Sequence, residues 1–305
     1  MDWTTEIAAA AARIAPHVQR TPVMDSAVLW DHPVALKLEH LQHTGSFKAR
    51  GAFNTLLSLP VPEAGVVAAS GGNHGAAVAY AASRLGHPAR IFVPELAGPA
   101  KIALIDRCGA DLTVVPGDYS NALEAARQLE AETGALQIHA YDAPATVAGQ
   151  GTLLREWEEQ GLEADTLLIA VGGGGLIAGA LAWSRGARRI VAVEPDTAPT
   201  LHAALEAGHP VDVAVSGVAA NALGARRIGD ICLGLAQDHL AASVRVSDAA
   251  ILEAQRTLWH SHRLLLEPAG ATALAALRSG AYVPAPGERV AVLLCGANPA
   301  PDPLP

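Results

Sequence analysis

Short runs of apolar, often β-branched residues alternate along the chain with longer stretches rich in alanine and other helix formers. The runs predict strands at 34–38, 65–69, 89–93, 111–115, 137–139, 166–171, 189–193 and 289–294, and the stretches predict helices at 75–85, 99–108, 119–132, 149–160, 176–183, 249–264 and 270–277. Strand and helix units that follow one another in this way are typical of α/β proteins. We therefore expect mostly parallel, doubly wound sheets.

The N-terminal segment predicts one more helix, on the surface, with its cap near Thr4 or Thr5. Its alanine run, 8–12, is too short to span a bilayer, and no basic segment typical of a signal peptide precedes it. No other uncharged apolar run approaches the length of a membrane span, and 299–305 predicts an extended tail. We expect no membrane partner.

The domain organisation carries no simple boundary. No linker rich in Ser, Gly or Pro divides the 305 residues, and no internal repeat is present. Strand and helix units continue without a break on both sides of residue 140. A second domain must therefore be interleaved with the first or lie closely against it.

Composition narrows the class of function. Half of the residues are hydrophobic but only 4% are aromatic, so the large core must be built from Ala, Val, Leu and Ile. The net charge of −9 argues against a nucleic-acid partner or an anionic membrane surface. The three cysteines, Cys108, Cys232 and Cys295, form no Cys-x-x-Cys pair. They fit neither a disulfide framework nor a structural zinc site, and favour free thiols in a reducing cytoplasm.

The strongest local feature is a run of four glycines between a predicted strand and a predicted helix: Gly172, Gly173, Gly174 and Gly175. Without side chains in the way, backbone N–H groups can converge on an anion at the positive end of the helix, and a phosphate is the natural ligand. A tight turn without a ligand would not need four glycines, which cost conformational entropy. No Walker lysine follows, and the partial match to Gly-x-Gly-x-x-Gly leaves a dinucleotide as an alternative.

A second glycine-rich turn also follows a predicted strand and opens a predicted helix. Its sequence is Ser70-Gly71-Gly72-Asn73-His74-Gly75, so polar side chains join the anion-binding backbone. Ser70 and Asn73 could instead be helix caps, and His74 a polar residue at a helix start. Two such turns in one chain suggest two anionic groups on one ligand assembly.

The third feature is Lys48, in the segment Thr44-Gly45-Ser46-Phe47-Lys48. A lone lysine is normally a solvated surface charge, but beside Phe47 and small residues this one can be semi-buried, where desolvation favours the neutral amine. An unperturbed lysine costs roughly 4.6 kcal/mol to deprotonate at pH 7. A nucleophilic role therefore requires such a setting.

Six motifs occur in the order in which one enzyme family carries them. They are Lys37-Leu38-Glu39 leading to Thr44-Gly45-Ser46-Phe47-Lys48-x-Arg50-Gly51, then Ser70-Gly71-Gly72-Asn73-His74-Gly75, Ala148-Gly149-Gln150-Gly151-Thr152, the four glycines, Glu267-Pro268-x-Gly270-Ala271 and Cys295-Gly296-x-Asn298. On these motifs the chain resembles the serine/threonine dehydratases among the pyridoxal-phosphate enzymes of fold-type II, which also include tryptophan synthase β and cysteine synthase. The resemblance covers nearly the whole chain.

The resemblance implies a role for each matched residue. Lys48 would carry the cofactor, pyridoxal 5'-phosphate, as a Schiff base, and Phe47 would pack against the pyridine ring. Gly172 to Gly175 would bind the cofactor phosphate, and Asn73 its phenolic O3′. Cys295 would face the pyridine nitrogen, where a thiol cannot hold a proton on the nitrogen as a carboxylate would, which suits β-elimination. The substrate would be bound by Ser70, Gly71, Gly72 and His74, which receive its carboxylate, and by Gln150.

The resemblance also implies the fold and the assembly. Fold-type II enzymes have two doubly wound α/β domains with mostly parallel sheets. Here the large cofactor-binding domain would comprise 1–62 and 145–305. A smaller domain, 63–144, would be inserted in it and carry the asparagine loop, defined as residues 70–75. We expect a homodimer.

Some members of the family bind a cation beside the active site. Their ligands are a Glu, a residue four positions later and often an Asp six positions later, and these positions here are Glu194, Ala198 and Thr200. Because a hard dication favours carboxylate oxygens, we expect no strong magnesium site. A monovalent cation held by Glu194 and Ala198 remains open.

The implied function is the β-elimination of water, followed by loss of ammonia, from a small β-hydroxy amino acid such as L-threonine or L-serine, giving a 2-oxo acid. An amino-acid racemase and a hydroxyaspartate or hydroxyectoine-pathway dehydratase of the same fold are alternatives. Serine racemases carry a serine where this chain has Gly71, which can transfer no proton, so we expect elimination. Three other classes fit less well. A nicotinamide-dependent oxidoreductase leaves Lys48 unexplained, a β-replacing synthase usually has Thr at the position of His74, and a non-catalytic binding module would lack Lys48.

Overall fold

The structure is a computed structural model that describes residues 1–117 and 119–299. In this part of the chain the strands are β1 Val23–Ser26, β2 Val34–Lys37, β3 Val66–Ala69, β4 Ala89–Pro94, β5 Asp111–Val115, β6 Leu136–Gln137, β7 Thr166–Ala170, β8 Arg189–Pro195, β9 Ala242–Val246 and β10 Val290–Leu293. The helices are α1 Trp3–Ile14, α2 Lys48–Ser58, α3 Asn73–Leu85, α4 Pro99–Asp106, α5 Tyr119–Thr133, α6 Pro144–Glu159, α7 Gly175–Ser184, α8 Thr200–Ala207, α9 Ala220–Leu223, α10 Asp230–His239, α11 Asp248–His262 and α12 Pro268–Ser279. Short 3-10 turns are η1 Glu39–Leu41, η2 His43–Gly45 and η3 Glu95–Ala97.

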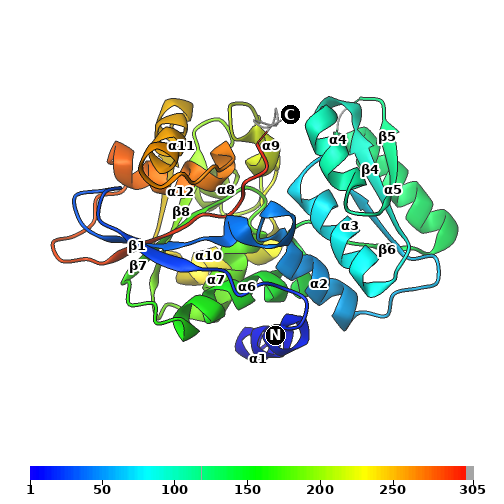
Figure 1. Cartoon of the computed structure of the whole chain (residues 1–305), viewed down its shortest axis with the longest axis horizontal. Helices are drawn as coiled ribbons and strands as arrows, with labels where there is room; N and C mark the ends of the chain where they lie inside the picture. Colours follow the sequence, from blue (N-terminus) through cyan, green and yellow to red (C-terminus); the bar gives the residue numbers. More distant parts are fainter. Residues whose placement is uncertain (118, 300–305) are drawn as a thin grey trace.

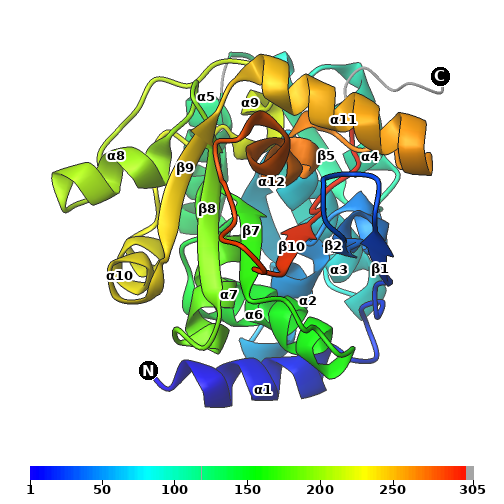
Figure 2. The ribbon, with the colours of Figure 1, turned by 90° about the vertical axis from the view of Figure 1, so that its left-hand side faces the viewer.

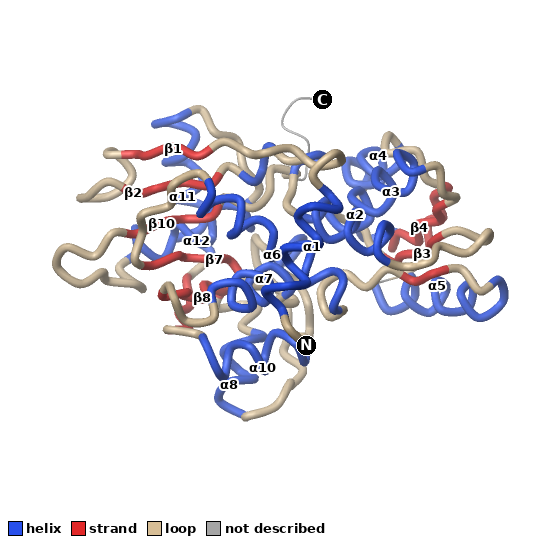
Figure 3. The backbone as a smooth tube through the Cα atoms, turned by 90° about the horizontal axis from the view of Figure 1, so that it is seen from below, coloured by secondary structure: helices blue, strands red, loops and turns tan. Residues whose placement is uncertain are grey.

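The strands form two sheets, which lie toward opposite ends of the molecule (Figure 1 and Figure 3). The larger has the order β1-β2-β10-β7-β8-β9, and all its neighbouring strands are parallel except β1 and β2. The smaller has the order β5-β4-β3-β6 and is parallel throughout. The expected α/β fold with two mostly parallel sheets is confirmed.

Helices cover both faces of each sheet. On the larger sheet α12 packs on one face with α11 outside it, and α7 and α6 cover the other face (Figure 2). On the smaller sheet α5 lies on one face and α3 and α4 on the other. Strands buried on both sides are apolar at every position, as in β7 and β10, which is why they stood out in the sequence.

The predicted N-terminal cap at Thr4 or Thr5 is wrong, because Asp2 caps α1. The carboxylate of Asp2 accepts hydrogen bonds from the backbone N–H groups of Thr4 and Thr5. Asp2 has an extended backbone and an ionised oxygen, which makes it the better acceptor at the N-terminus. The helix also buries one face, including Ile7 and Ile14, against its neighbours.

Other element boundaries also differ from the prediction. Helix α6 begins at Pro144 rather than at 149, because a proline at the first helical position is favourable. Strands β1 and β9 were not predicted, since both are partly exposed and lack an apolar run. Helices α8, α9 and α10 were missed as well, between predicted elements. Apart from Pro299, the predicted tail 299–305 lies outside the described residues.

Helix α2 belongs to the packing of both sheets' surroundings. Its residues Ala49, Ala52, Phe53 and Leu56 join the apolar core of the smaller sheet, and the helix also packs against α6. A boundary between domains at residue 62 therefore stays a prediction. In the described part of the chain, no helix has both the length and the hydropathy needed to cross a membrane.

Candidate active site

The carboxyl ends of four strands deliver the residues singled out in the sequence. Strand β3 ends one residue before Ser70, β7 ends shortly before Gly172, and β10 ends shortly before Cys295. Strand β2 leads through η1 and η2 to Lys48, the first residue of α2. In parallel α/β sheets this is the end at which ligands bind.

Backbone pairing holds Lys48 next to the end of β10. The N–H of Phe47 donates to the carbonyl of Cys295 at 3.2 Å, and the N–H of Ala297 donates to the carbonyl of Gly45 at 2.9 Å. An isolated antiparallel bridge joins Ser46 to Gly296. The loop before Lys48 is thus tied to residues more than 200 positions later in the chain, and the two sites predicted from separate motifs are brought together.

The amine of Lys48 has the properties that nucleophilic chemistry requires. Its Nζ donates to the carbonyl of Ala140 at 2.8 Å and lies 5.1 Å from the centre of the Phe47 ring. Burial lowers the pKa of Lys48 to about 8. Deprotonation at pH 7 then costs roughly 1.4 kcal/mol instead of roughly 4.6 kcal/mol.

His74 lies in the same pocket of the fold. Its Nε2 lies 2.9 Å from the carbonyl of Ile138, two residues before the carbonyl that accepts from Lys48. Burial, followed by the nearby charge of Lys48, lowers the pKa of His74 to about 3. His74 is therefore neutral at physiological pH, and can orient a ligand without adding charge.

The segment 138–142 connects the two halves of the site. Its Tyr141 ring packs directly against Gly173 and Gly175, and the Asp142 carboxylate accepts from the backbone N–H groups of Asp230 and Ile231 at the start of α10. The sequence analysis treated this segment only as the end of a strand. It runs from β6 of the smaller sheet to the glycine loop of the larger one.

The four glycines form a cradle that side chains would fill. A Cβ at Gly173 or Gly175 would collide with Tyr141, one at Gly172 would lie 2.8 Å from Leu223, and Gly174 has φ +94°. Only glycine meets these conditions at all four positions. Helix α7 begins at Gly175, so its N–H groups point into the loop, and the cradle fits a phosphate.

Unpartnered polar atoms near Lys48 also fit a polar ligand. The buried hydroxyls of Thr44 and Ser46 have no hydrogen-bond partner in the structure. A buried hydroxyl without a partner is unfavourable, so a ligand that binds beside Lys48 would find two hydrogen-bonding groups available. These residues fit pyridoxal phosphate, with its aldehyde at Lys48 and its phosphate in the glycine cradle.

Asn73 is held between two side chains from the C-terminal part of the chain. Its Nδ2 donates to Glu267 at 2.6 Å, and its Oδ1 accepts from Asn298 at 2.9 Å. Glu267 is buried, and burial raises its pKa to about 7. Sequence reasoning quoted the motif that contains Glu267 but gave this carboxyl no role.

Cys295 carries a neutral thiol. Burial, with a further effect of Glu267, raises its pKa to about 12, and its Sγ lies 3.7 Å from the carbonyl of Ala269. A thiol with this pKa is protonated at all physiological pH values. It can therefore offer a ring nitrogen only a weak, uncharged partner.

Glu194 and Ala198, the expected cation ligands, are engaged within the chain. The Glu194 carboxylate accepts from the N–H groups of Leu201 and His202 at 2.7 and 2.8 Å, and from the Thr200 hydroxyl at 3.2 Å. The carbonyl of Ala198 accepts from the N–H of Thr200 at 3.1 Å. No group of three or more His, Cys, Asp or Glu side chains in the described residues is placed to hold a metal. A cation at this position stays a prediction.

The remaining predicted residues lie near these groups. Ser70 Oγ accepts from the N–H of Gly72 at 3.2 Å, inside the asparagine loop. A Cβ at Gly71 would lie 2.5 Å from the Cβ of Ala97 in η3. Gln150 is buried, with its side-chain amide packed against Gly51 on α2. Its role in substrate binding stays a prediction.

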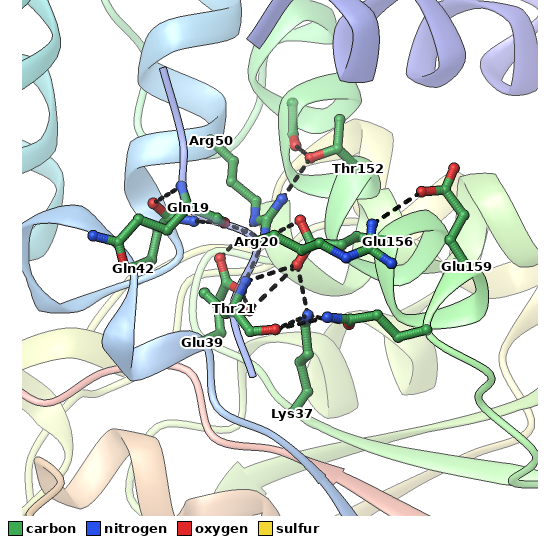
Figure 4. Close-up of polar contacts among 12 residues, drawn as sticks. Gln19, Arg20, Thr21, Lys37, Glu39, Gln42, Arg50, Thr152, Glu156 and Glu159 are labelled. Carbon is green, nitrogen blue, oxygen red and sulfur yellow. Dashed lines mark hydrogen bonds and ion pairs between the residues drawn. The ribbon is translucent and has the colours of Figure 1, made fainter. Parts of the chain in front are cut away.

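A buried ionic cluster lies behind α2 (Figure 4). Arg50 pairs with Glu39 at 2.5 Å and with Glu156 at 2.9 Å, and Lys37 pairs with Glu156 at 2.6 Å. Two cations and two anions balance, and Arg50 also contacts Thr152. Because Arg50 lies in the first turn of α2, the cluster fixes the position from which Lys48 extends.

A cavity of about 470 Å³ opens beside this cluster, between α1 and α6. Its charged lining residues pair with one another: Arg155 with Glu159 at 3.0 Å, Arg20 with Glu159 at 3.5 Å, and Arg50 with Glu156. Nothing in its lining calls for a ligand. The chemistry therefore concentrates at Lys48.

Comparisons with known proteins agree with this geometry. A family model described as "Pyridoxal-phosphate dependent enzyme" matches residues 14–296. The chain is 38% identical over 300 residues to a phenylserine dehydratase of Ralstonia pickettii, covering 96% of this chain and 92% of that protein. It is 39% identical over 301 residues to a putative threonine dehydratase of Sinorhizobium fredii, covering 94% and 89%. Among solved structures, maize serine racemase superposes with a TM-score of 0.91 at 32% identity, covering 97% of this chain and 93% of that one.

Proposed function

Because the chain belongs to the family of pyridoxal-phosphate-dependent enzymes and is a lyase, we propose that it removes water and ammonia from a small β-hydroxy amino acid such as L-serine or L-threonine. The observation that carries the proposal is the Lys48 amine. It has a lowered pKa and lies among two glycine-rich helix N-termini and a neutral thiol. Serine would give pyruvate and ammonia, and threonine would give 2-oxobutyrate and ammonia.

The chain's own residues divide the work of holding the cofactor. Lys48 would bind its aldehyde carbon, the loop Gly172 to Gly175 its phosphate, and Asn73 its phenolic oxygen. Phe47 would pack against its ring, and Cys295 would face its nitrogen. When bound, pyridoxal phosphate supplies an electron sink for the bond that breaks at Cα.

Lys48 then has two tasks at the substrate. Once the substrate amine has displaced it, its neutral amine takes the Cα proton as a general base. The protonated amine is the nearest acid for the departing β-hydroxyl. The asparagine loop would hold the substrate carboxylate with its backbone N–H groups, and the neutral His74 would help orient it.

Elimination is favoured over racemisation by the asparagine loop. Racemisation needs a second acid–base group on the face of Cα away from Lys48. Gly71 has no side chain, and the Ser70 hydroxyl is used by the N–H of Gly72. The loop thus offers the opposite face no obvious proton carrier.

The preferred substrate is a finer question than the family. The similar proteins named above act on phenylserine or threonine or, in maize, belong to a serine racemase. We propose small β-hydroxy amino acids. A homodimer, a cytoplasmic location, a monovalent cation at Glu194 and Ala198, and an inserted domain at 63–144 stay predictions beside this one.

The test is a panel of β-hydroxy amino acids assayed for ammonia and 2-oxo acid, with chiral analysis of the remaining amino acid. The purified protein should be yellow, and borohydride reduction should fix the cofactor on the peptide that contains Lys48. Lys48→Ala should lose both trapping and turnover, and so should Lys48→Arg, which keeps the charge. Trapping on Lys37 or Lys101 would contradict the assignment, and D-serine formed as fast as pyruvate would make the protein a racemase.

A further inference from the structure

The chain uses lysine sparingly and only in its interior. Its 21 basic residues include three lysines, at positions 37, 48 and 101. Lys37 is 0% exposed and is explained by its ion pair with Glu156, and Lys48 is explained by the proposed chemistry. Lys101 is 3% exposed, and the proposed function does not use it. A buried ammonium is unfavourable without a partner, so its presence requires an explanation.

Lys101 lies where the two sheets' surroundings meet. It belongs to α4, which packs on the smaller sheet, and its Nζ donates at 3.2 Å to the carbonyl of Asn221 in α9, beside the larger sheet. The same Nζ is 3.5 Å from the point that a Cβ on Gly72 would occupy. The ammonium therefore adjoins the asparagine loop, at Gly72, while Lys48 acts electrostatically on its other end at His74.

The partners of Lys101 do not neutralise it. In the described part of the chain no carboxylate lies within 4.0 Å of its Nζ, whereas Lys37 has Glu156 at 2.6 Å together with a carbonyl and an amide oxygen. Glu267 acts on Lys101 through space, but its hydrogen-bond partner is Asn73. Desolvation lowers the pKa of Lys101. One neutral carbonyl leaves two of the three ammonium donors free for an anion.

We propose that Lys101 binds the α-carboxylate of the substrate against the asparagine loop, as a charged substrate-binding residue that completes the backbone N–H groups. This inference rests on the proposed function, which brings an amino acid to that loop. The hydrogen bond to Asn221 sets the direction of the ammonium. An anionic ligand would provide the counter-charge that the chain itself does not place in contact with this lysine.

The test measures recognition of the carboxylate without any turnover. Glycine has no β-hydroxyl to eliminate, and glycinamide is the same ligand without the carboxylate charge. Binding of each to the cofactor-loaded protein is followed by the change in the cofactor's visible absorption. The variant is Lys101→Gln, which keeps a donor for the Asn221 carbonyl but loses the charge. The control is Arg107→Gln, which removes a cation from the exposed C-terminal end of the same helix.

We expect the wild type and Arg107→Gln to prefer glycine strongly over glycinamide. In Lys101→Gln glycine should bind at least about 30-fold more weakly and glycinamide nearly as before, because a buried charge pair has lost one partner. Lys101→Met serves as the second variant if the Gln variant does not fold.

Three results would overturn the proposal. One is an unchanged preference for glycine in the Lys101 variants, and another is an equal loss for glycine and glycinamide, which would indicate a structural role. The third is a loss seen only with a dicarboxylic substrate such as 3-hydroxyaspartate, which would place the lysine at the β-substituent. If the wild type releases no 2-oxo acid from any β-hydroxy amino acid, the proposed function fails while the glycine ratio still tests Lys101.

Discussion

Glu267→Gln should change how the stability of the protein depends on pH. The Glu267 carboxyl is 3% exposed, and burial raises its pKa from 4.5 to about 7 despite the hydrogen bond from Asn73. The folded protein therefore keeps a proton that the unfolded chain has already released. The stabilisation that this carboxyl gives is full below about pH 4.5, and it is lost as pH rises toward 7.

The size of the effect follows from the two pKa values. Between pH 5 and pH 8 the wild type should lose roughly 2 to 3 kcal/mol of unfolding free energy through this one group. Glutamine has no proton to release, and its amide oxygen can still accept from Asn73. Glu194, whose pKa burial also raises to about 7, is present in both proteins and cancels from the comparison.

The measurement is urea unfolding at pH 5, 6, 7 and 8 on protein without added cofactor. The difference in unfolding free energy, variant minus wild type, should grow by roughly 2 to 3 kcal/mol across that range. The exposed Glu163→Gln variant should run parallel to the wild type. Parallel curves for Glu267→Gln would refute the reasoning, since they would mean that the carboxyl is ionised as easily in the fold as in the unfolded chain.

Three further predictions concern the loops around Lys48. Gly71→Ser alone should destabilise the asparagine loop, because its Cβ would lie 2.5 Å from that of Ala97; the double variant with Ala97→Gly should restore stability in thermal unfolding and gain D-serine formation in chiral analysis. Cys295→Ser should keep elimination activity, whereas Cys295→Asp should lower kcat about tenfold or more by holding a proton on the ring nitrogen; equal kcat values would place this side chain elsewhere. Arg50→Leu should lower the unfolding free energy by about 3 to 5 kcal/mol in urea titration, since it leaves two buried carboxylates with one cation; a loss below 1 kcal/mol would show that the cluster is hydrated.

The architecture could be predicted because its signals are local. Strands buried on both faces are continuous apolar runs, and the turns that follow two of them are rich in glycine, so strand β7 and the loop from Gly172 were visible together. Strand β9 was not visible, because a partly exposed edge strand has no such run. The cap of α1 was missed by two residues, since Asp, Thr and Thr are all good caps in sequence.

The contacts of the site could be predicted only in part. Lys48 and Cys295 were linked through a family resemblance, and the structure adds the backbone pairing that joins them. The contact between Asn73 and Glu267 spans 194 positions, and that between Lys101 and Asn221 spans 120. Neither contact leaves a periodic signal in sequence, because each depends on how the two sheets are placed relative to each other.

Acylation of Lys101 by an amine-directed reagent would require the contact with Asn221 to open, and acylation of Lys37 would require the ionic cluster to unfold. The order in which these two sites are acylated would then report, by mass spectrometry, how often each part of the molecule opens.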